Sequence, residues 1–408
     1  MKFGLLGEKL THSLSPQIHN ELGISDYSLF QVNREDLSRF FAENEFSGIN
    51  VTIPYKKDAM QFCKKIDEHA EKIGSVNTIK RETDGTLSGY NTDYYGFLFL
   101  LNSNNISVFG KKVIILGSGG ACAAVKAVLS DLRAKEIVIV SRSGENNYEN
   151  ISRNFDAQII VNTTPVGMYP DNLNSPLTLE GFSALEAVVD VIYNPLKTKI
   201  MLDGEKRGIK CVNGLSMLVA QAKAAEEIFL EKEIPDSEIQ RVLNKLEKDS
   251  KNIVLVGMPG CGKSTVAKEL GKMLSRQVLD TDKIIEEDAQ MIIPQIFDKM
   301  GEDAFRELEI KAVAKAGKTL SSVIATGGGI VKRKENFASV KQNGFVVYLE
   351  RDIEELFTSG RPLSKDITAL KQMFSARESL YKEISDVTVK VGENPTKTAQ
   401  SIIERFVK

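Results

Sequence analysis

The sequence predicts an α/β protein with parallel sheets, and three observations support this fold class. Short apolar runs alternate with amphipathic stretches along the chain, as in strands joined by right-handed helical crossovers. Two glycine-rich turns, at residues 117–122 and 257–265, each follow an apolar run and precede a helical pattern, which indicates two nucleotide-binding units. With 408 residues, the chain is also longer than one ordinary core and is expected to form two or three domains.

The composition excludes several classes of protein. Hydrophobic residues make up 42% and charged residues 26%, as in ordinary globular proteins and unlike disordered or collagen-like chains. No apolar run reaches the roughly 18 residues that a membrane span needs, and the first residues do not resemble a signal peptide, so a cytoplasmic enzyme is expected. The 53 basic and 55 acidic residues nearly balance, so neither nucleic acid nor a membrane is an expected partner.

The expected strands and the boundary between the two units can be placed along the chain. The strands are expected at residues 112–116, 136–140, 158–161, 187–191 and 210–212 in the first unit, and at 253–256, 277–279, 323–325 and 346–349 in the second. Residues 231–251 are dense in charge and contain Pro235. They predict a short amphipathic helix through about residue 248, followed by a linker. This helix could equally be the last one of the first unit.

The second glycine-rich turn fits the phosphate-binding P-loop pattern. Gly257 is followed by Gly262, Lys263 and Ser264 at the required spacing. In such a loop the backbone N–H groups surround phosphate oxygens, the lysine neutralises their charge, and the hydroxyl binds Mg²⁺. The predicted ATP contacts are Gly260, Cys261, Gly262, Lys263, Ser264 and Thr265.

Residues that could act on a phosphate acceptor follow the P-loop. Asp280 and Asp282 come at the end of the next strand, where one carboxylate could hold Mg²⁺ through water and the other could take a proton from a hydroxyl. Arg306 and Glu309 are helix neighbours, so the glutamate can hold the guanidinium, although an exposed helix ion pair is the commoner arrangement. Later features are the glycines at 327–329, Arg361 in an expected lid loop, and Arg377 on a helix.

The P-loop, the motifs DTD, GEDAFRELE, ATGGG and RPL, and the helix from Arg377 to Tyr381, in this order, resemble the shikimate kinase family over residues 251–408. The resemblance implies transfer of the ATP γ-phosphate to the 3-hydroxyl of shikimate. It implies that Lys263 is catalytic, that Asp282 contacts the hydroxyl, and that Arg361 is the cation of the lid. The implied Mg²⁺ ligands are Ser264 and Asp280, and the implied carboxylate contacts are Arg306, Arg377, Gly327, Gly328 and Gly329. The segment before Arg361 is shorter than is usual in the family, which predicts weaker contacts to ATP.

The first glycine-rich turn is an altered dinucleotide fingerprint. It begins at Gly117 and has Cys122 where a third glycine would stand. An NAD site would place Asp or Glu at the end of the next strand, to accept from the ribose 2′-hydroxyl. This chain has Ser141, Arg142 and Ser143 there, and a cation with hydroxyls suits the 2′-phosphate of NADP(H).

Polar residues gather in expected loops on both sides of this turn. Each segment alone is more typical of a turn than of a site, and GINVTIPYK reads as a strand that ends at its lysine. In this order, the segments SLSPQIHN, GINVTIPYK, GSVNT, GYNTD, VNTTPVGM, DVIYNP and NGLSMLVAQ resemble the shikimate dehydrogenase family over about residues 1–235. The resemblance implies reversible NADPH-dependent reduction of 3-dehydroshikimate to shikimate.

The family's functional residues carry over by position. Lys56 and Asp93 are the implied catalytic pair near the C3 oxygen, where an ammonium can stabilise alkoxide charge and supply a proton. The implied substrate contacts are Ser13, Ser15, Thr52, Asn77, Gln221 and Tyr193. The implied cofactor contacts are Gly117, Ser118, Gly119, Gly120, Ala121, Ser141, Arg142, Val191 and Gly214, with Glu68 as a further position. His12 and His19 are expected to be structural.

One departure from the dehydrogenase family concerns the cofactor. Members that select NADP often carry a second arginine four residues after the first, and this chain has Asn146 there. A single arginine, Arg142, predicts a modest preference for NADPH over NADH.

The two resemblances together predict a bifunctional enzyme of the shikimate pathway. The expected domains are a substrate-binding domain at 1–101, to which helices from about 213–248 return, a Rossmann-like NADP domain at 102–212, and a P-loop kinase domain at 251–408. The alternatives are a quinate/shikimate dehydrogenase that uses NAD, fused to a weak or regulatory kinase-like module; a kinase for another small polyol; and a nucleotide-binding module without activity.

Overall fold

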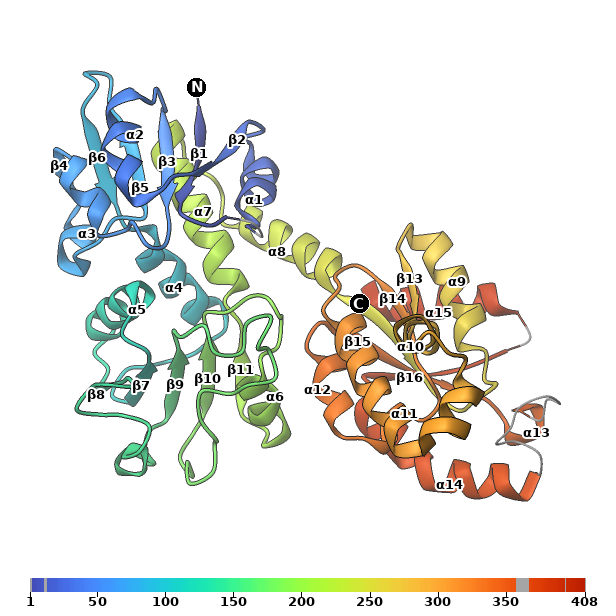
Figure 1. Ribbon diagram of the computed structural model, residues 1–408. Helices are drawn as coiled ribbons and strands as arrows, with labels where there is room; N and C mark the ends of the chain where they lie inside the picture. Colours follow the sequence, from blue (N-terminus) through green and yellow to red (C-terminus); the bar gives the residue numbers. More distant parts are fainter. Residues whose placement is uncertain (1, 11–12, 357–366, 393, 408) are drawn as a thin grey trace. The chain divides into compact units, whose positions relative to one another are not determined.

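The computed structural model describes residues 2–10, 13–356, 367–392 and 394–407 (Figure 1). The chain divides into two compact units, Met1–Tyr193 with Asp203–Lys245 and Asn194–Leu202 with Leu246–Lys408. Among the described strands, two sheets belong to the first unit and one to the second. No helix in the described residues is long and apolar enough to cross a bilayer.

The first sheet brings several loop segments to one edge. Its strands are β1 (Phe3–Gly7), β2 (Tyr27–Gln31), β3 (Gly48–Val51), β4 (Lys65–Ile66), β5 (Thr78–Arg81) and β6 (Leu87–Tyr90), in the order β2-β1-β3-β5-β6-β4. β1 is parallel to β2 and β3, whereas β5 is antiparallel to both β3 and β6. The carboxyl ends of β1, β3 and β6 therefore meet the amino end of β5 at the same edge.

Two largely apolar helices, α4 (Thr92–Ser103) and α7 (Leu215–Leu230), pack side by side between the first two sheets (Figure 1). The other helices of this region are α1 (Ser15–Leu22), α2 (Leu37–Glu43), α3 (Glu68–Ile73) and α8 (Ser237–Ser250). Helix α7 also packs against α1. At its end Phe229 stacks on Phe3 of β1, with ring centroids 5.4 Å apart. Helix α7, which follows the second sheet in the sequence, thus completes the hydrophobic core of the first sheet.

The second sheet has five parallel strands in the order β11-β10-β9-β7-β8. They are β7 (Lys112–Leu116), β8 (Glu136–Val140), β9 (Ile159–Asn162), β10 (Ala187–Asp190) and β11 (Lys210–Val212), and the neighbouring helices are α5 (Gly120–Asp131) and α6 (Lys199–Lys206). β7, β8 and β11 have the predicted bounds, and β9 and β10 differ from them by one residue. Their valine and isoleucine runs are typical of parallel strands covered on both faces.

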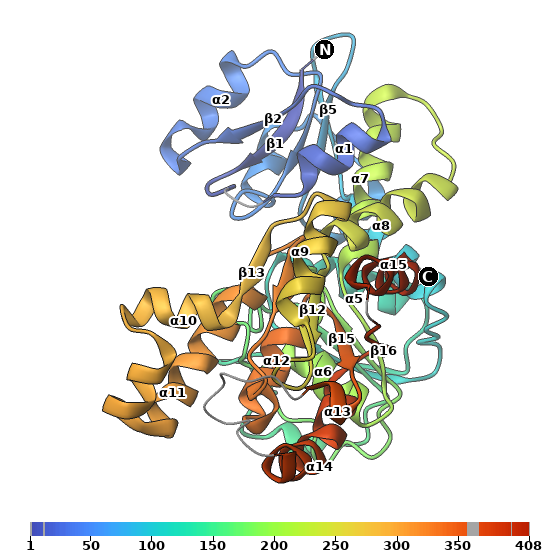
Figure 2. The same ribbon diagram turned by 90° about the vertical axis from the view of Figure 1, so that its right-hand side faces the viewer.

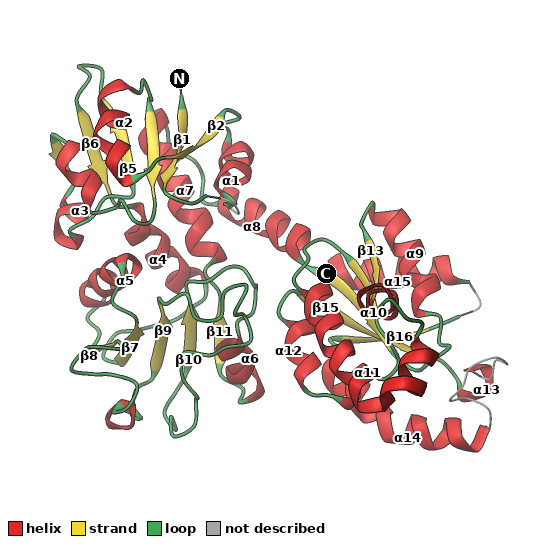
Figure 3. Cartoon of the chain, viewed as in Figure 1, coloured by secondary structure: helices red, strands yellow, loops and turns green. Residues whose placement is uncertain are grey.

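The third sheet is also parallel, in the order β13-β14-β12-β15-β16. Figure 3 shows its strands in yellow, with helices around them in red. Its strands are β12 (Asn252–Val256), β13 (Val278–Asp280), β14 (Val323–Ala325), β15 (Gly344–Glu350) and β16 (Val387–Lys390). Its helices are α9 (Lys263–Leu274), α10 (Thr281–Ala289), α11 (Ile293–Gly317), α12 (Glu335–Lys341), α13 (Ile353–Leu356), α14 (Ile367–Ile384) and α15 (Pro395–Val407). Because β12 is central, the P-loop that follows it lies in the middle of the sheet edge.

Helix α11 is interrupted at Gly301. This residue has φ 82° and ψ 174°, outside the helical region, and positive φ favours glycine. The helical segment that carries Arg306 and Glu309, the predicted helix neighbours, therefore begins after this break. Figure 2 shows α10 and α11 packed against each other.

We expect Gly96→Ala to destabilise the packing of α4 on α7. A Cβ at this buried position would lie 2.6 Å from the Met217 carbonyl oxygen, and such overpacking costs about 1–3 kcal/mol. Hydrogen exchange measured by mass spectrometry should show faster exchange in peptides from α4 and α7. Ser103→Ala, at an exposed position of the same helix, is the control, and equal exchange in the two variants would contradict the prediction.

Candidate functional site

A cluster of polar side chains lies at the edge where β3, β5 and β6 meet. Lys56 Nζ donates to Asp93 Oδ2 at 2.5 Å, and Asn77 Nδ2 donates to Asp93 Oδ1 at 2.9 Å. The Asn77 amide also reaches Gln221 Oε1 on α7, at 3.5 Å. Four residues predicted from separate segments are thus joined. An ammonium held by a buried carboxylate can donate a proton to an oxygen that gains negative charge.

The turn after β3 places Lys56. The expectation that the strand ends at this lysine is wrong, because β3 stops at Val51. Pro54 has no N–H to donate to a neighbouring strand, so the ladder of hydrogen bonds does not continue through it. Tyr55 is fully buried, and its hydroxyl donates to the Val32 carbonyl oxygen at 2.6 Å. This contact anchors the turn and so fixes the backbone position of Lys56, the next residue.

Ser13 and Ser15 lie at the start of α1. Ser15 N donates to Ser13 Oγ at 3.2 Å, and Ser15 is buried. One turn later, His19 is fully buried between Glu226 of α7 and Asn50 of β3, at 3.1 Å from each. The histidine therefore fixes α1 against two other elements, in agreement with the expected structural role.

The first glycine-rich turn leaves space above the amino end of α5. Gly117 has φ 99°, which favours glycine. A Cβ added at Gly119 would meet no atom within 4 Å, and one at Gly120 would meet only Lys56 Cδ, at 4.0 Å. The free N–H groups of a helix start suit a pyrophosphate, and here they face the predicted catalytic lysine.

The other predicted cofactor contacts lie at the same edge of the second sheet. Ser141 and the exposed Arg142 follow β8, the parallel neighbour of β7. A Cβ on Gly214 would lie 2.0 Å from the Val191 carbonyl oxygen, so this contact requires glycine. Ser118 and Ala121 belong to the glycine-rich turn and the first turn of α5.

The P-loop wraps the amino end of α9. Lys263 Nζ donates to the carbonyl oxygens of Gly257 at 2.8 Å and Met258 at 2.9 Å. Ser264 Oγ donates to Asp280 Oδ2 at 2.9 Å. A hydroxyl and a carboxylate side by side provide the oxygen ligands that Mg²⁺ prefers. The loop also contains Gly260, Cys261 and Gly262, and Thr265 follows in α9.

Asp282 is the second carboxylate at this edge. Asp280 Oδ1 accepts from the Asp282 backbone N–H at 3.1 Å and so caps α10. Burial, and then the neighbouring charge of Asp280, raise the pKa of Asp282 to about 6. A carboxylate with this pKa can take a proton near neutral pH.

The three glycines after β14 allow three different side chains to approach the backbone. An added Cβ would lie 2.6 Å from Asp282 Oδ1 at Gly327, 2.6 Å from Pro259 Cγ at Gly328, and 2.2 Å from Arg306 Nη1 at Gly329. These contacts place the predicted proton acceptor, the P-loop and the predicted carboxylate-binding arginine around one short segment.

Arg306 and Arg377 reach this glycine segment from two helices. The Arg306 side chain is only 6% exposed, and its Nη1 donates to the buried Glu309 at 2.9 Å. The alternative of an exposed helix ion pair is therefore wrong. Arg377 Nη1 donates to the Gly328 carbonyl oxygen at 3.0 Å. Arg306 is thus fixed by Glu309 against Gly329, and Arg377 is fixed by the Gly328 carbonyl oxygen, so two guanidinium groups whose N–H donors could bind an anion lie along one short segment.

The remaining predicted residues are less closely tied to these clusters. Thr52 lies directly after β3. Tyr193 follows β10 in the second sheet, and burial raises the pKa of its hydroxyl. Glu68 is exposed at the start of α3. Arg361 and His12 lie outside the described residues.

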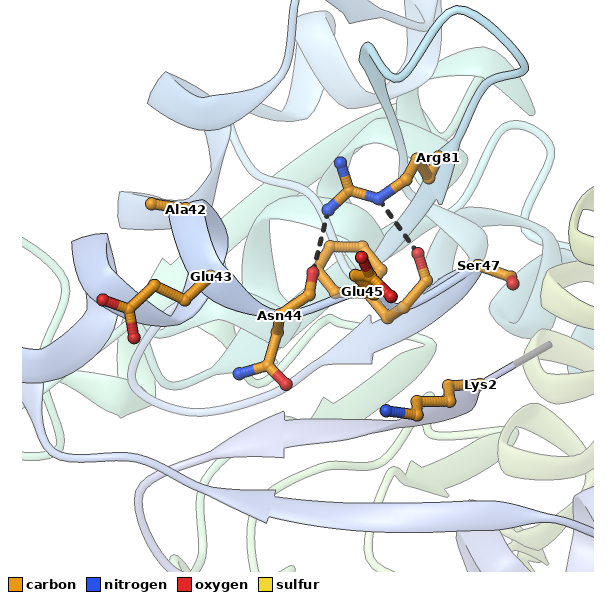
Figure 4. A pocket seen from close by; sticks show the side chains of 8 residues that line it. Lys2, Ala42, Glu43, Asn44, Glu45, Ser47 and Arg81 are labelled. Atoms are coloured by element: carbon orange, nitrogen blue, oxygen red, sulfur yellow. Dashed lines mark hydrogen bonds between the residues drawn. The ribbon is translucent and has the colours of Figure 1, made fainter.

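A surface pocket lies apart from all of these residues, around the ends of β1 and α2 (Figure 4). Its lining consists of Lys2, Ala42, Glu43, Asn44, Glu45, Phe46, Ser47 and Arg81. Arg81 donates to the carbonyl oxygens of Phe46 and Asn44 at 3.0 and 3.1 Å. This arginine therefore ties the loop after α2 to β5.

Comparison with known proteins identifies both halves. Residues 5–79 match the family model of the shikimate dehydrogenase substrate-binding domain, and residues 259–407 match that of shikimate kinase. The NADP(+) shikimate dehydrogenase of Clostridium beijerinckii is 40% identical over 269 residues, which are 61% of this chain and 99% of that protein. The chain belongs to the shikimate dehydrogenase family. It also carries a shikimate kinase domain.

Solved structures of the shikimate dehydrogenase family agree with this assignment. A chorismate mutase/shikimate 5-dehydrogenase fusion protein from Clostridium acetobutylicum is 39% identical, with a TM-score of 0.57, and the match covers 60% of this chain and 97% of that one. The Thermus thermophilus shikimate 5-dehydrogenase in complex with NADP(H) and shikimate is 29% identical, with a TM-score of 0.55, and the match covers 60% of this chain and 99% of that one.

Two residues lie in motifs quoted from the sequence, but sequence reasoning gave neither of them a role. In the shikimate dehydrogenase part, Thr92 Oγ1 donates to Gln221 Oε1 at 3.3 Å, and its N–H donates to Asn77 Oδ1 at 2.7 Å. In the shikimate kinase domain, Tyr381 donates to the Gly328 carbonyl oxygen at 2.5 Å. The available signals were weak: Thr92 sits beside a predicted residue, and Tyr381 lies one helical turn after Arg377.

We expect Gly329→Ala to raise the KM for shikimate about tenfold or more, with the KM for ATP little changed. The added Cβ would displace the Arg306 guanidinium, which lies 2.2 Å from its position. Steady-state kinase assays measure both constants. Gly392→Ala, where an added Cβ meets no atom within 4 Å, is the matched control, and equal KM values in the two variants would refute the expected effect.

Proposed function

We propose that this chain reduces 3-dehydroshikimate to shikimate with NADPH and then phosphorylates shikimate with ATP to shikimate 3-phosphate. One observation carries the proposal: the same chain holds two sites. In one, the Lys56–Asp93 pair lies beside a dinucleotide turn. In the other, Arg306 packs against the glycine segment beside a P-loop. The product of the first reaction is the substrate of the second. Membership of the dehydrogenase family and the match to shikimate kinase support the same reactions.

In the dehydrogenase reaction, Lys56 is the proposed acid. Hydride transfer to C3 builds negative charge on the substrate oxygen, which the ammonium stabilises and then protonates. Asp93 orients the ammonium through the bond at 2.5 Å. The proposed carboxylate contacts are Ser13 and Ser15, the proposed contacts to ring hydroxyls are Thr52, Asn77 and Gln221, and Tyr193 closes the pocket.

NADP(H) is the proposed cofactor of this reaction. The N–H groups of the turn from Gly117 to Ala121 would bind the pyrophosphate, Ser141 and Arg142 would bind the 2′-phosphate, and Val191 and Gly214 would line the cofactor. Without a second arginine at position 146, we expect the preference for NADPH to be modest.

In the kinase reaction, Lys263 and the P-loop N–H groups bind the ATP phosphates. Ser264 and Asp280 would hold Mg²⁺, which neutralises phosphate charge when bound. Asp282 takes the proton of the 3-hydroxyl, in keeping with its pKa near 6. Arg306, Arg377 and the glycine segment hold the substrate carboxylate, and Arg361 remains a prediction from the sequence.

Mass spectrometry of the products tests the two reactions together. The purified chain is given 3-dehydroshikimate, NADPH, ATP and Mg²⁺. We expect shikimate 3-phosphate, which should disappear when NADPH or ATP is withheld. Shikimate without phosphate would reject the kinase half, and no product would reject both. A parallel reaction with NADH tests the cofactor, and equal rates would overturn the choice of NADP(H).

We expect Lys56→Ala to lower the dehydrogenase kcat by about 10²–10⁴-fold, as is typical for loss of a general acid, with a much smaller change in KM. Initial rates of NADPH oxidation measure both constants. Lys57→Ala removes the adjacent exposed lysine and should retain activity. A change confined to KM would assign Lys56 to substrate binding alone.

A further inference from the structure

In the kinase domain, Glu302 lies between two cations beside the glycine segment. Its Oε1 accepts from Arg306 Nε at 3.3 Å, from Arg306 Nη2 at 3.1 Å, and from Lys332 Nζ. The Glu302 side chain is 50% exposed, whereas that of Arg306 is 6% exposed. Glu302 can therefore move into solvent, while the guanidinium is held by the packing around it.

Glu309 binds the same guanidinium in a different way. It accepts from Arg306 Nη1 at 2.9 Å, and its side chain is 1% exposed. A carboxylate buried to this extent stays in place, because leaving would strand a buried charge on both partners. Glu309 is thus the permanent partner of Arg306, and Glu302 is the one that can be exchanged.

The atoms that Glu302 occupies are suited to a ligand. Nε and Nη2 form one edge of the guanidinium and present two parallel N–H groups, the arrangement that binds a carboxylate through both oxygens. Both of these donors point to a single oxygen of Glu302. A substrate carboxylate that binds this edge must first displace Glu302.

We propose that, in the free enzyme, Glu302 occupies the place on Arg306 that the substrate carboxylate takes when it binds. When the substrate displaces Glu302 from Arg306, Glu302 keeps its contact with Lys332. The inference rests on the proposed kinase function. Lys332 ends the short 3-10 helix at Ile330–Lys332, directly after the three glycines. Since it already contacts Glu302, the glutamate keeps a cationic partner after it leaves Arg306. Glu302 and Lys332 are positioning residues, because both act through Arg306.

This exchange affects binding and leaves the chemical step unchanged. Displacing Glu302 from Arg306 is part of the free energy of shikimate binding, and Lys332 makes that displacement easier. Neither side chain takes part in phosphate transfer. Changes at these positions should therefore appear in the KM for shikimate, with kcat and the KM for ATP retained.

The experiment compares kinase kinetics of the wild-type chain with Lys332→Met, Glu302→Gln and the double variant. Lys332→Met should raise the KM for shikimate about three- to fivefold, the size expected for one partly exposed ion pair, and Lys332→Arg should restore it. Glu302→Gln should lower this KM, because the competing carboxylate is gone. In the double variant the KM should equal that of Glu302→Gln, since Lys332 acts only through Glu302.

Asp303→Asn provides the matched control. Asp303 is the next residue along α11, its side chain is 99% exposed, and it pairs with Arg333, the residue after Lys332, at 3.3 Å. Removing this charge should leave all constants unchanged, which separates exchange at Arg306 from a general effect of surface charge.

Three results would overturn the inference while leaving the proposed function intact. These are an unchanged KM in Lys332→Met, an increase in KM in Glu302→Gln, and an equal effect of Lys332→Met with or without Glu302. The second would mean that Glu302 only orients Arg306. A wild-type chain that forms no shikimate 3-phosphate would instead reject the proposed kinase function, and this inference with it.

Discussion

Each site depends on a cation that a buried carboxylate holds at the edge of a sheet. In the dehydrogenase part, Asp93 accepts from both Lys56 and Asn77, and it lies in the first turn of α4. In the kinase domain, Glu309 holds Arg306 from the next turn of the same helix. A long cationic side chain otherwise samples many rotamers, so these bonds fix the direction of charge before a substrate arrives.

The backbone around each cation is built to let ligands and side chains come close. Gly329 brings main-chain atoms against the Arg306 guanidinium, and Gly120 leaves only Lys56 near the amino end of α5. At Gly120 a Cβ would project into the space proposed for the cofactor, whereas at Gly329 it would collide with the Arg306 guanidinium, 2.2 Å away. At Gly120 the start of α5 then supplies N–H groups beside that space. The element that the two sites share is therefore a cation held by a carboxylate and packed beside a glycine.

Much of this arrangement was predictable because it is local in sequence. The strand, glycine turn and helix order placed β7 and β12, and parallel pairing then placed the residues that follow each strand at a common edge. The strand proposed to end at Lys56 failed because alternation of side chains was read past Pro54. Contacts such as His19 with Glu226, 207 positions apart, and Lys332 with Glu302 leave no periodic signal, so only the folded chain reveals them.

The two sites are proposed to recognise the same carboxylate by different means, and this difference has a physical consequence. Hydroxyls such as those of Ser13 and Ser15 are neutral, so an empty pocket lined by them needs no counter-ion. Leaving an arginine as buried as Arg306 without a partner would cost several kcal/mol of folding free energy, because its charge would be buried and uncompensated. The kinase domain therefore must supply a carboxylate of its own when substrate is absent. A permanent partner in Glu309, together with an exposed one in Glu302, meets that requirement and still leaves one edge of the guanidinium exchangeable.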